Sequence, residues 1–115
     1  MNNMYKHTSG TAESADGDVD NLVLAAPGAS KVLRVLTGIL TVHVASAGNA
    51  GKAALEDGAG GTRVFEVDAD TVGEYAIDFG PLGYPLTANT GLNLTVDEDG
   101  GTEATATCTV TAYIL

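Results

Sequence analysis

Two histidines and one cysteine are the side chains of this 115-residue sequence best able to act as a base or a nucleophile. Nucleophilic catalysis needs Ser, Cys or Thr beside a base that a third group orients. His7 lies near the start of the sequence, and His43 lies in a long apolar run, where we expect a structural or interfacial role. Cys108 alternates with Ala106 and Val110, so we expect a buried, unreactive thiol. These residues predict no nucleophilic active site.

Paired carboxylates are the next chemistry to consider, because two of them can hydrolyse a glycosidic bond. Glu74 and Asp78 lie four residues apart on one face of an expected strand, about 13 Å from each other at ~3.3 Å per residue. That separation is too large for a cooperating pair, so we expect a solvated outer face. The stretch Gly58-Ala59-Gly60-Gly61 lacks the following Lys and helix of a phosphate loop.

The alternating aspartates Asp16, Asp18 and Asp20 are the best candidates for metal ligands, since calcium prefers hard oxygen donors. An EF-hand loop starting at Asp16 would need Gly and Glu where the sequence has Asn21 and Pro27. The motif therefore fails, and acidic loops also serve solubility. We predict no cofactor and no metal, with calcium at these three residues as a weak alternative.

Composition excludes other classes of function. Fifteen acidic side chains against five basic ones give a formal net charge of −10, which argues against nucleic-acid binding. A single cysteine allows no intramolecular disulfide. No apolar run approaches the ~20 residues of a membrane helix, and residues 1–20 lack the apolar centre of a signal peptide. The length fits one domain.

Hydrophobic periodicity points to strands throughout. Residues 103–115 alternate between apolar side chains and threonines, which is the strongest signal in the chain. Residues 73–79 and 92–97 alternate in the same way. Residues 32–45 are apolar on both faces and rich in β-branched side chains, so we expect one long bent strand, or two strands in line, with Gly38 at a bulge or bend. Shorter candidates are residues 22–25, 53–57 and 62–67.

Turn residues separate these runs. Glycine-rich segments occur at 47–51 and 57–61, and residues 80–85 form a stiffer loop with two prolines. Asp99-Gly100-Gly101 lies between two alternating runs and indicates a hairpin. Seven to eight short strands with frequent turns predict an all-β fold, an antiparallel β-sandwich or jelly-roll-like domain over residues 19–115.

Residues 1–18 show no alternating run, and we expect an extended N-terminal arm. One alternative is a terminus without function. Met4 and Tyr5 are large side chains that a solvated tail would not need, which favours an arm that docks on a partner.

The predicted core is poor in large side chains, because the chain has two Phe, four Tyr and no Trp. Assembly would bury a further apolar face and stabilise such a domain. The two-sided run at 32–44 and the threonine-lined face of 103–115 both suit a subunit contact, although ordinary core strands with solvated outer faces explain them equally well. We predict a homo-oligomer, and we expect it to be a trimer.

The order of features also resembles a known family. The segments DNLVLAAPGASKVLRVLTGILTVHVA, YAIDFGPLGYPLTANTGLNLTVDEDG and ATATCTVTAYIL resemble the small proteins that decorate, or cement, the heads of tailed bacteriophages. The resemblance implies a non-enzymatic protein, made in the host cytoplasm, that binds the major capsid protein on the outer surface of the virion. It also implies a trimer at three-fold sites that stabilises the shell. It assigns no residue a role; our own interface candidates are Met4, Tyr5, His43, Leu82 and Tyr84.

A receptor- or carbohydrate-binding β-domain of a phage tail or fibre is the alternative. Its loops at 46–52, 57–62 and 80–85 would then recognise the ligand. Sugar sites usually contain an exposed aromatic ring for stacking, and outside the arm the sequence offers only Tyr84 in a loop. An enzyme is the least favoured class.

Overall fold

The computed structural model describes residues 6–15, 21–44, 51–97 and 105–115, which form nine strands and no helix. None of these residues belongs to a helix long and apolar enough to cross a membrane. The predicted all-β sandwich is confirmed. The strands are β1 (Lys6–Ala15), β2 (Asn21–Leu24), β3 (Leu33–Val44), β4 (Lys52–Asp57), β5 (Thr62–Asp68), β6 (Gly73–Asp78), β7 (Tyr84–Pro85), β8 (Leu92–Val96) and β9 (Thr105–Ile114).

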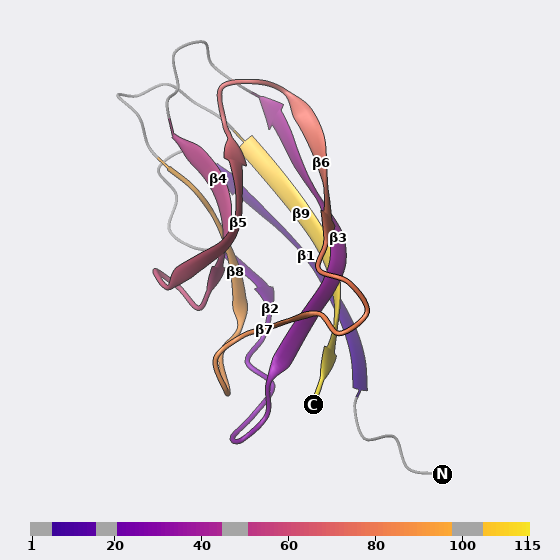
Figure 1. Cartoon of the computed structure of the whole chain (residues 1–115). Coiled ribbons are helices and arrows are strands. Elements are labelled where there is room, and N and C mark those ends of the chain that lie inside the picture. The colour runs from indigo at the N-terminus through magenta and orange to yellow at the C-terminus, as the bar shows by residue number, and fades with distance from the viewer. Residues whose placement is uncertain (1–5, 16–20, 45–50, 98–104) are drawn as a thin grey trace.

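Two antiparallel sheets face each other (Figure 1). One has the order β1-β9-β3-β6, with the two-residue β7 also paired to β3, and the other has the order β2-β8-β4-β5. If β7 is set aside, the eight remaining strands have the order of a jelly roll, in which successive strands change sheets except at the β4–β5 hairpin. This is one of the two arrangements that the sequence predicts.

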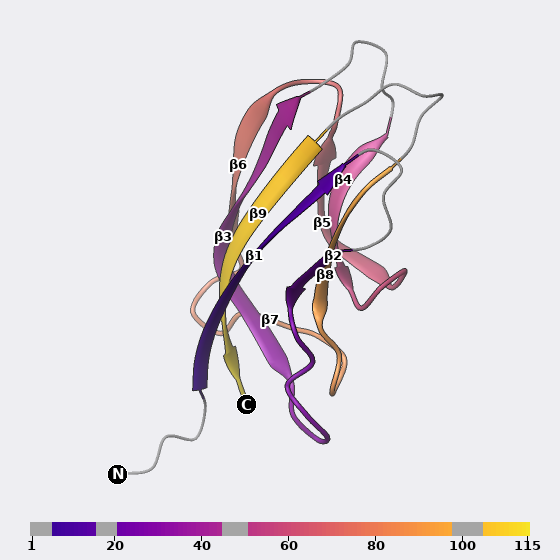
Figure 2. The ribbon, with the colours of Figure 1, turned by 180° about the vertical axis from the view of Figure 1, so that it is seen from behind.

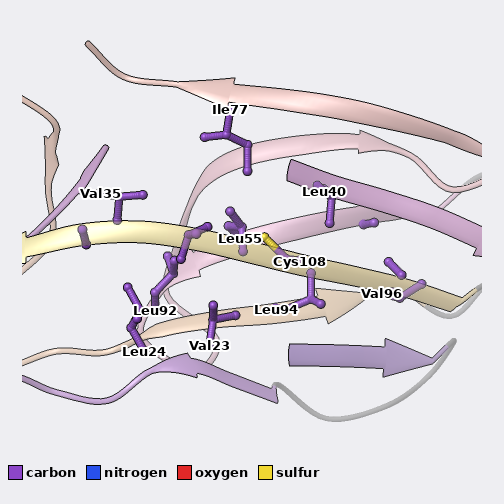
Figure 3. Packing of buried hydrophobic residues seen from close by; sticks show 14 of the residues in the cluster. Val23, Leu24, Val35, Leu40, Leu55, Ile77, Leu92, Leu94, Val96 and Cys108 are labelled. Atoms are coloured by element: carbon purple, nitrogen blue, oxygen red, sulfur yellow. The ribbon is translucent and has the colours of Figure 1, made fainter. Parts of the chain in front are cut away.

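The core fills the space between the sheets with aliphatic side chains (Figure 3). Leu40 of β3, Leu55 of β4 and Leu94 of β8 are fully buried. Phe65 and Phe79 are only partly buried at its margin. The centre of the domain is therefore built from leucine, valine and alanine, as the low aromatic content predicts.

The long strands β3 and β9 pair along almost their whole length. From Ala106 to Ala112 of β9 the apolar positions are buried and the intervening threonines are more exposed, which confirms the predicted alternation within β9. The register of β3 against β9 shifts between Val35 and Thr37 and again between Val42 and Val44, and not at Gly38 itself. A Cβ atom on Gly38 would lie 2.4 Å from the carbonyl oxygen of Thr109, so Gly38 allows the two strands to approach closely.

The segment that we expected as an arm contains β1. Residues Lys6–Ala15 pair with β9 in an unbroken antiparallel register, and β1 lies along the edge of the five-stranded sheet (Figure 2). Pairing with β9 gives this segment a ladder of backbone hydrogen bonds, which needs no apolar alternation in β1. A division between an arm and a domain at residue 18 stays a prediction, because residues 16–20 lie outside the described ranges.

The predicted hairpin between residues 92–97 and 103–115 is wrong. Strand β8 pairs with β2 and β4, whereas β9 pairs with β1 and β3 in the opposite sheet. Each of the two strands buries its own apolar face in the shared core, one from each side. The turn Asp99-Gly100-Gly101 itself falls outside the described residues.

Candidate functional site

Cys108 is buried in the core, as expected from its place in the alternating run. Desolvation raises the pKa of the thiol to about 12. Because the thiolate is the reactive form, this cysteine is inert at neutral pH.

The two carboxylates of β6 lie on its exposed face, as predicted. Glu74 is opposite Thr41, and Asp78 is opposite Thr37 on β3. The Asp78 carboxylate accepts a hydrogen bond of 2.8 Å from the backbone N–H of Gly80, so it supports the turn that follows β6. This arrangement supports a structural role for Asp78.

A charged network covers the outer side of the four-stranded sheet, around Arg63 of β5. The guanidinium forms a bidentate ion pair with Asp97: Nη1 is 2.9 Å from Oδ2, and Nη2 contacts Oδ1. The same Nη1 is 3.3 Å from Oε2 of Glu66, and Nε is 3.7 Å from Oε2 of Glu56, whose side chain is only 7% exposed. The hydrogen bonds with Asp97 raise the pKa of Arg63 and lower the pKa of Asp97.

This network joins the hairpin of β4 and β5 to Asp97, which lies 34 positions after Arg63 in the sequence. Sequence reasoning missed it, although Glu56 and Arg63 flank a predicted turn and therefore had to meet across a hairpin. Asp97 comes from the end of β8, which pairs with β4 on the side away from β5. In the described part of the chain, no three His, Cys, Asp or Glu side chains are placed to hold a metal ion.

The interface candidates do not form one cluster. His43 is exposed on β3, and its Nε2 is 2.5 Å from Oγ1 of Thr107. Tyr84 lies opposite Val35, eight residues earlier on β3, which corresponds to roughly 26 Å at ~3.3 Å per residue. Met4, Tyr5, Asp16, Asp18 and Asp20 are outside the described residues.

Leu82 and Tyr84 do lie together, in the segment of residues 79–86, which contains the short strand β7 and which we call the apolar loop. Leu82 is 74% exposed, and Tyr84 is exposed beside Phe79, with ring centroids 5.4 Å apart. The carbonyl oxygen of Leu82 accepts hydrogen bonds from Arg34 Nη1 at 3.2 Å and from the hydroxyl of Tyr113 at 3.0 Å. The loop is therefore fastened to both β3 and β9 while it presents its leucine side chain to solvent.

The glycines of the apolar loop make this attachment possible. Gly80 and Gly83 have φ angles of 80° and 71°, and the N–H of Gly83 donates to the carbonyl of Gly80 over 3.1 Å. A Cβ atom on Gly83 would lie 2.9 Å from the carbonyl oxygen of Val35. Glycine thus lets the loop turn tightly against β3.

Comparisons with known proteins find matches among solved structures and none among protein families or curated proteins. No protein-family model and no curated protein matches the sequence. Among solved structures, the chain is similar to the VP2 subviral particle of infectious bursal disease virus, with 14% identity and a TM-score of 0.33 over 96% of this chain and 36% of that chain. A structure of the Gx strain of the same virus matches with 13% identity and a TM-score of 0.33, over 97% of this chain and 36% of the other.

Proposed function

We propose that this chain is a non-enzymatic structural protein of a phage particle. It binds the major capsid protein on the outer surface of the head and stabilises the shell, acting as a homo-oligomer, a trimer at three-fold sites. The observation that carries this proposal is the apolar loop, a rigid support for an exposed leucine. Docking on the shell would bury that side chain.

The energetics of the apolar loop favour a binding role. Fully burying a leucine side chain is worth about 1.5–3 kcal/mol, and Leu82 leaves most of its surface in water. Hydrogen bonds from Arg34 and Tyr113 already hold the loop, so little conformational entropy is lost when it binds. Three loops in one trimer would convert a modest affinity per site into tight attachment through effective concentration.

Other observations support a structural role. The thiol of Cys108 is buried, and the carboxylates around Arg63 are engaged in ion pairs within the protein. Jelly rolls occur in viral capsid proteins and in lectins, so the fold agrees with both of the functions that the sequence suggests, and fold alone does not choose between them. The exposed Leu82 of the apolar loop and the resemblance of the sequence to decoration proteins favour binding to the capsid over binding to a receptor or carbohydrate.

Co-sedimentation with undecorated phage heads tests the proposal. We expect the wild-type chain to pellet with the heads at a saturable stoichiometry. Leu82→Ser should weaken binding about tenfold per site, equivalent to ~1.4 kcal/mol of lost apolar burial. Val72→Ser is the matched control, because Val72 is 61% exposed in a different loop and should bind like the wild type.

Two results would contradict the proposal. One is an unchanged affinity of the Leu82→Ser variant together with saturable binding of the wild type. The other is retention of the chain on immobilised glycans without any binding to heads, which would favour the ligand-binding tail domain.

A further inference from the structure

A positive charge lies directly beside the leucine that we expect to dock. Nη1 of Arg34 donates to the backbone carbonyl oxygen of Leu82 over 3.2 Å, and Arg34 is only partly exposed. A stable protein interface buries about 800 Å² of each partner. A contact of that size centred on Leu82 therefore also covers the guanidinium of Arg34.

The side chains around this guanidinium have the composition of an interface core. Phe79 and Tyr84 belong to the apolar loop, and the hydroxyl of Tyr113 donates to the carbonyl of Leu82, so three of the six aromatic residues of the chain gather here. Tyrosine and arginine are enriched at the centres of interfaces, where they contribute much of the binding energy. Arg34 thus lies where a contact with the shell would be centred.

Arg34 has no counter-ion in the part of this chain that the structure describes. Among the same residues, Lys52 and Arg63 do form ion pairs, whereas Arg34 donates to the neutral carbonyl of Leu82. The carboxylate of Asp78, just before the apolar loop, accepts the N–H of Gly80. A guanidinium has five N–H donors, so most of those of Arg34 are left for a partner.

Removing this cation from water is strongly unfavourable unless an anion takes the place of the water. A carboxylate matches the planar guanidinium best, because its two oxygens can accept two parallel hydrogen bonds. We propose that Arg34 pairs with an acidic side chain of the major capsid protein when the apolar loop docks on the shell. The inference rests on the proposed function and names the chemistry of the partner surface, an Asp or Glu carboxylate beside an apolar recess for Leu82.

Co-sedimentation with undecorated phage heads tests this inference. We expect Arg34→Met to bind at least ~30-fold more weakly per site than the wild type, because an acidic side chain of the shell would be buried without its partner. Tyr113→Phe is the matched control, since it removes the other hydrogen bond to the carbonyl of Leu82 and changes no charge. The control should weaken binding by no more than about tenfold.

A second set of heads, whose carboxylates are converted to neutral amides with carbodiimide and ethanolamine, tests the chemistry of the partner. Wild-type binding should fall to the level of Arg34→Met on untreated heads, or below it. Arg34→Met should bind the amidated heads at least as well as the untreated ones, because no carboxylate is then left without a partner. That result would also show that amidation leaves the docking surface of the heads intact.

Three results would overturn the inference while the proposed function stands. One is binding of Arg34→Met that equals or exceeds that of the wild type on untreated heads. Another is equal weakening by Arg34→Met and Tyr113→Phe, which would mean that Arg34 acts only by holding the apolar loop. The third is an equal loss of wild-type and Arg34→Met binding on amidation, which would place the carboxylate away from Arg34. A wild type that binds no heads would contradict the proposed function, and this inference would fall with it.

Discussion

Replacing Arg63 with methionine would test whether the ion-pair network stabilises the sandwich. Methionine keeps much of the length of the side chain and removes the positive charge. The change leaves the carboxylates of Glu56, Glu66 and Asp97 without the guanidinium that now lies among them. Of these three, Glu56 matters most, because its side chain is 7% exposed and water cannot replace the lost partner.

The size of the effect follows from the degree of burial. Breaking a buried ion pair by removing one partner costs about 3–5 kcal/mol, whereas an exposed pair contributes about 0–1 kcal/mol. Arg63 is 32% exposed and Glu56 is almost fully buried, which places this network between the two limits. We therefore expect Arg63→Met to lower the free energy of unfolding by about 2–3 kcal/mol.

Urea denaturation followed by circular dichroism measures this loss. With an m value of about 1–3 kcal/mol per M, the midpoint should fall by roughly 0.7–3 M. The double variant Glu56→Gln/Arg63→Met should recover about 1 kcal/mol, because a neutral amide needs no ionic partner. Arg34→Met is the control: its guanidinium donates to the carbonyl of Leu82, and the loss should stay near 1 kcal/mol.

Two results would refute this reasoning. A loss below about 1 kcal/mol for Arg63→Met would mean that the network behaves like an ordinary exposed ion pair. Equal stability of the single and double variants would mean that the uncompensated charge of Glu56 is not the cause of the destabilisation.

Three further predictions follow from the same structure. Gly38→Ala should lower the free energy of unfolding by about 2–3 kcal/mol in urea titrations, since its Cβ atom would lie 2.4 Å from the carbonyl oxygen of Thr109. Arg63 lowers the pKa of Asp97 from its ordinary value of 3.8, so this pair stabilises the fold fully above that pH and loses its effect as the pH falls through the lower folded-state pKa. Urea midpoints from pH 7 to pH 2 should show a smaller decline in Arg63→Met than in the wild type. Cys108 should resist alkylation at pH 8 in the native protein and react on unfolding, because burial raises its pKa to about 12; rapid native labelling would contradict this.

The strands could largely be predicted from the sequence. The alternation of threonines with Ala106, Cys108 and Val110 predicted β9 and the buried cysteine, and the structure confirms both. Residues 58–61 lie between β4 and β5 and residues 80–83 lie between β6 and β7, whereas Tyr84 and Pro85, which we expected in the loop, form β7. These features were accessible because side-chain alternation has a period of two, so that neighbouring residues alone indicate a strand.

The pairing of the strands could not be predicted from this local alternation. Strand β1 lacks apolar alternation, and only its partner β9 makes it a strand. The expected hairpin between residues 92–97 and 103–115 failed because each run is compatible with either sheet. The sequence established that both have an apolar face, and the closure of the sandwich decided which sheet each joins.

The same distinction between what the sequence predicts and what the tertiary structure decides applies to the candidate functional residues. The sequence by itself determined that reactive groups are few, that acidic residues dominate, and that residues 80–85 form a stiff loop containing Leu82. Only the tertiary structure decided that Arg34 and Tyr113 fasten this loop, and that Arg63 gathers carboxylates from three different parts of the chain. Periodicity is a local property of the chain, whereas these contacts join residues separated by up to 48 positions, which meet only when the strands of each sheet have paired.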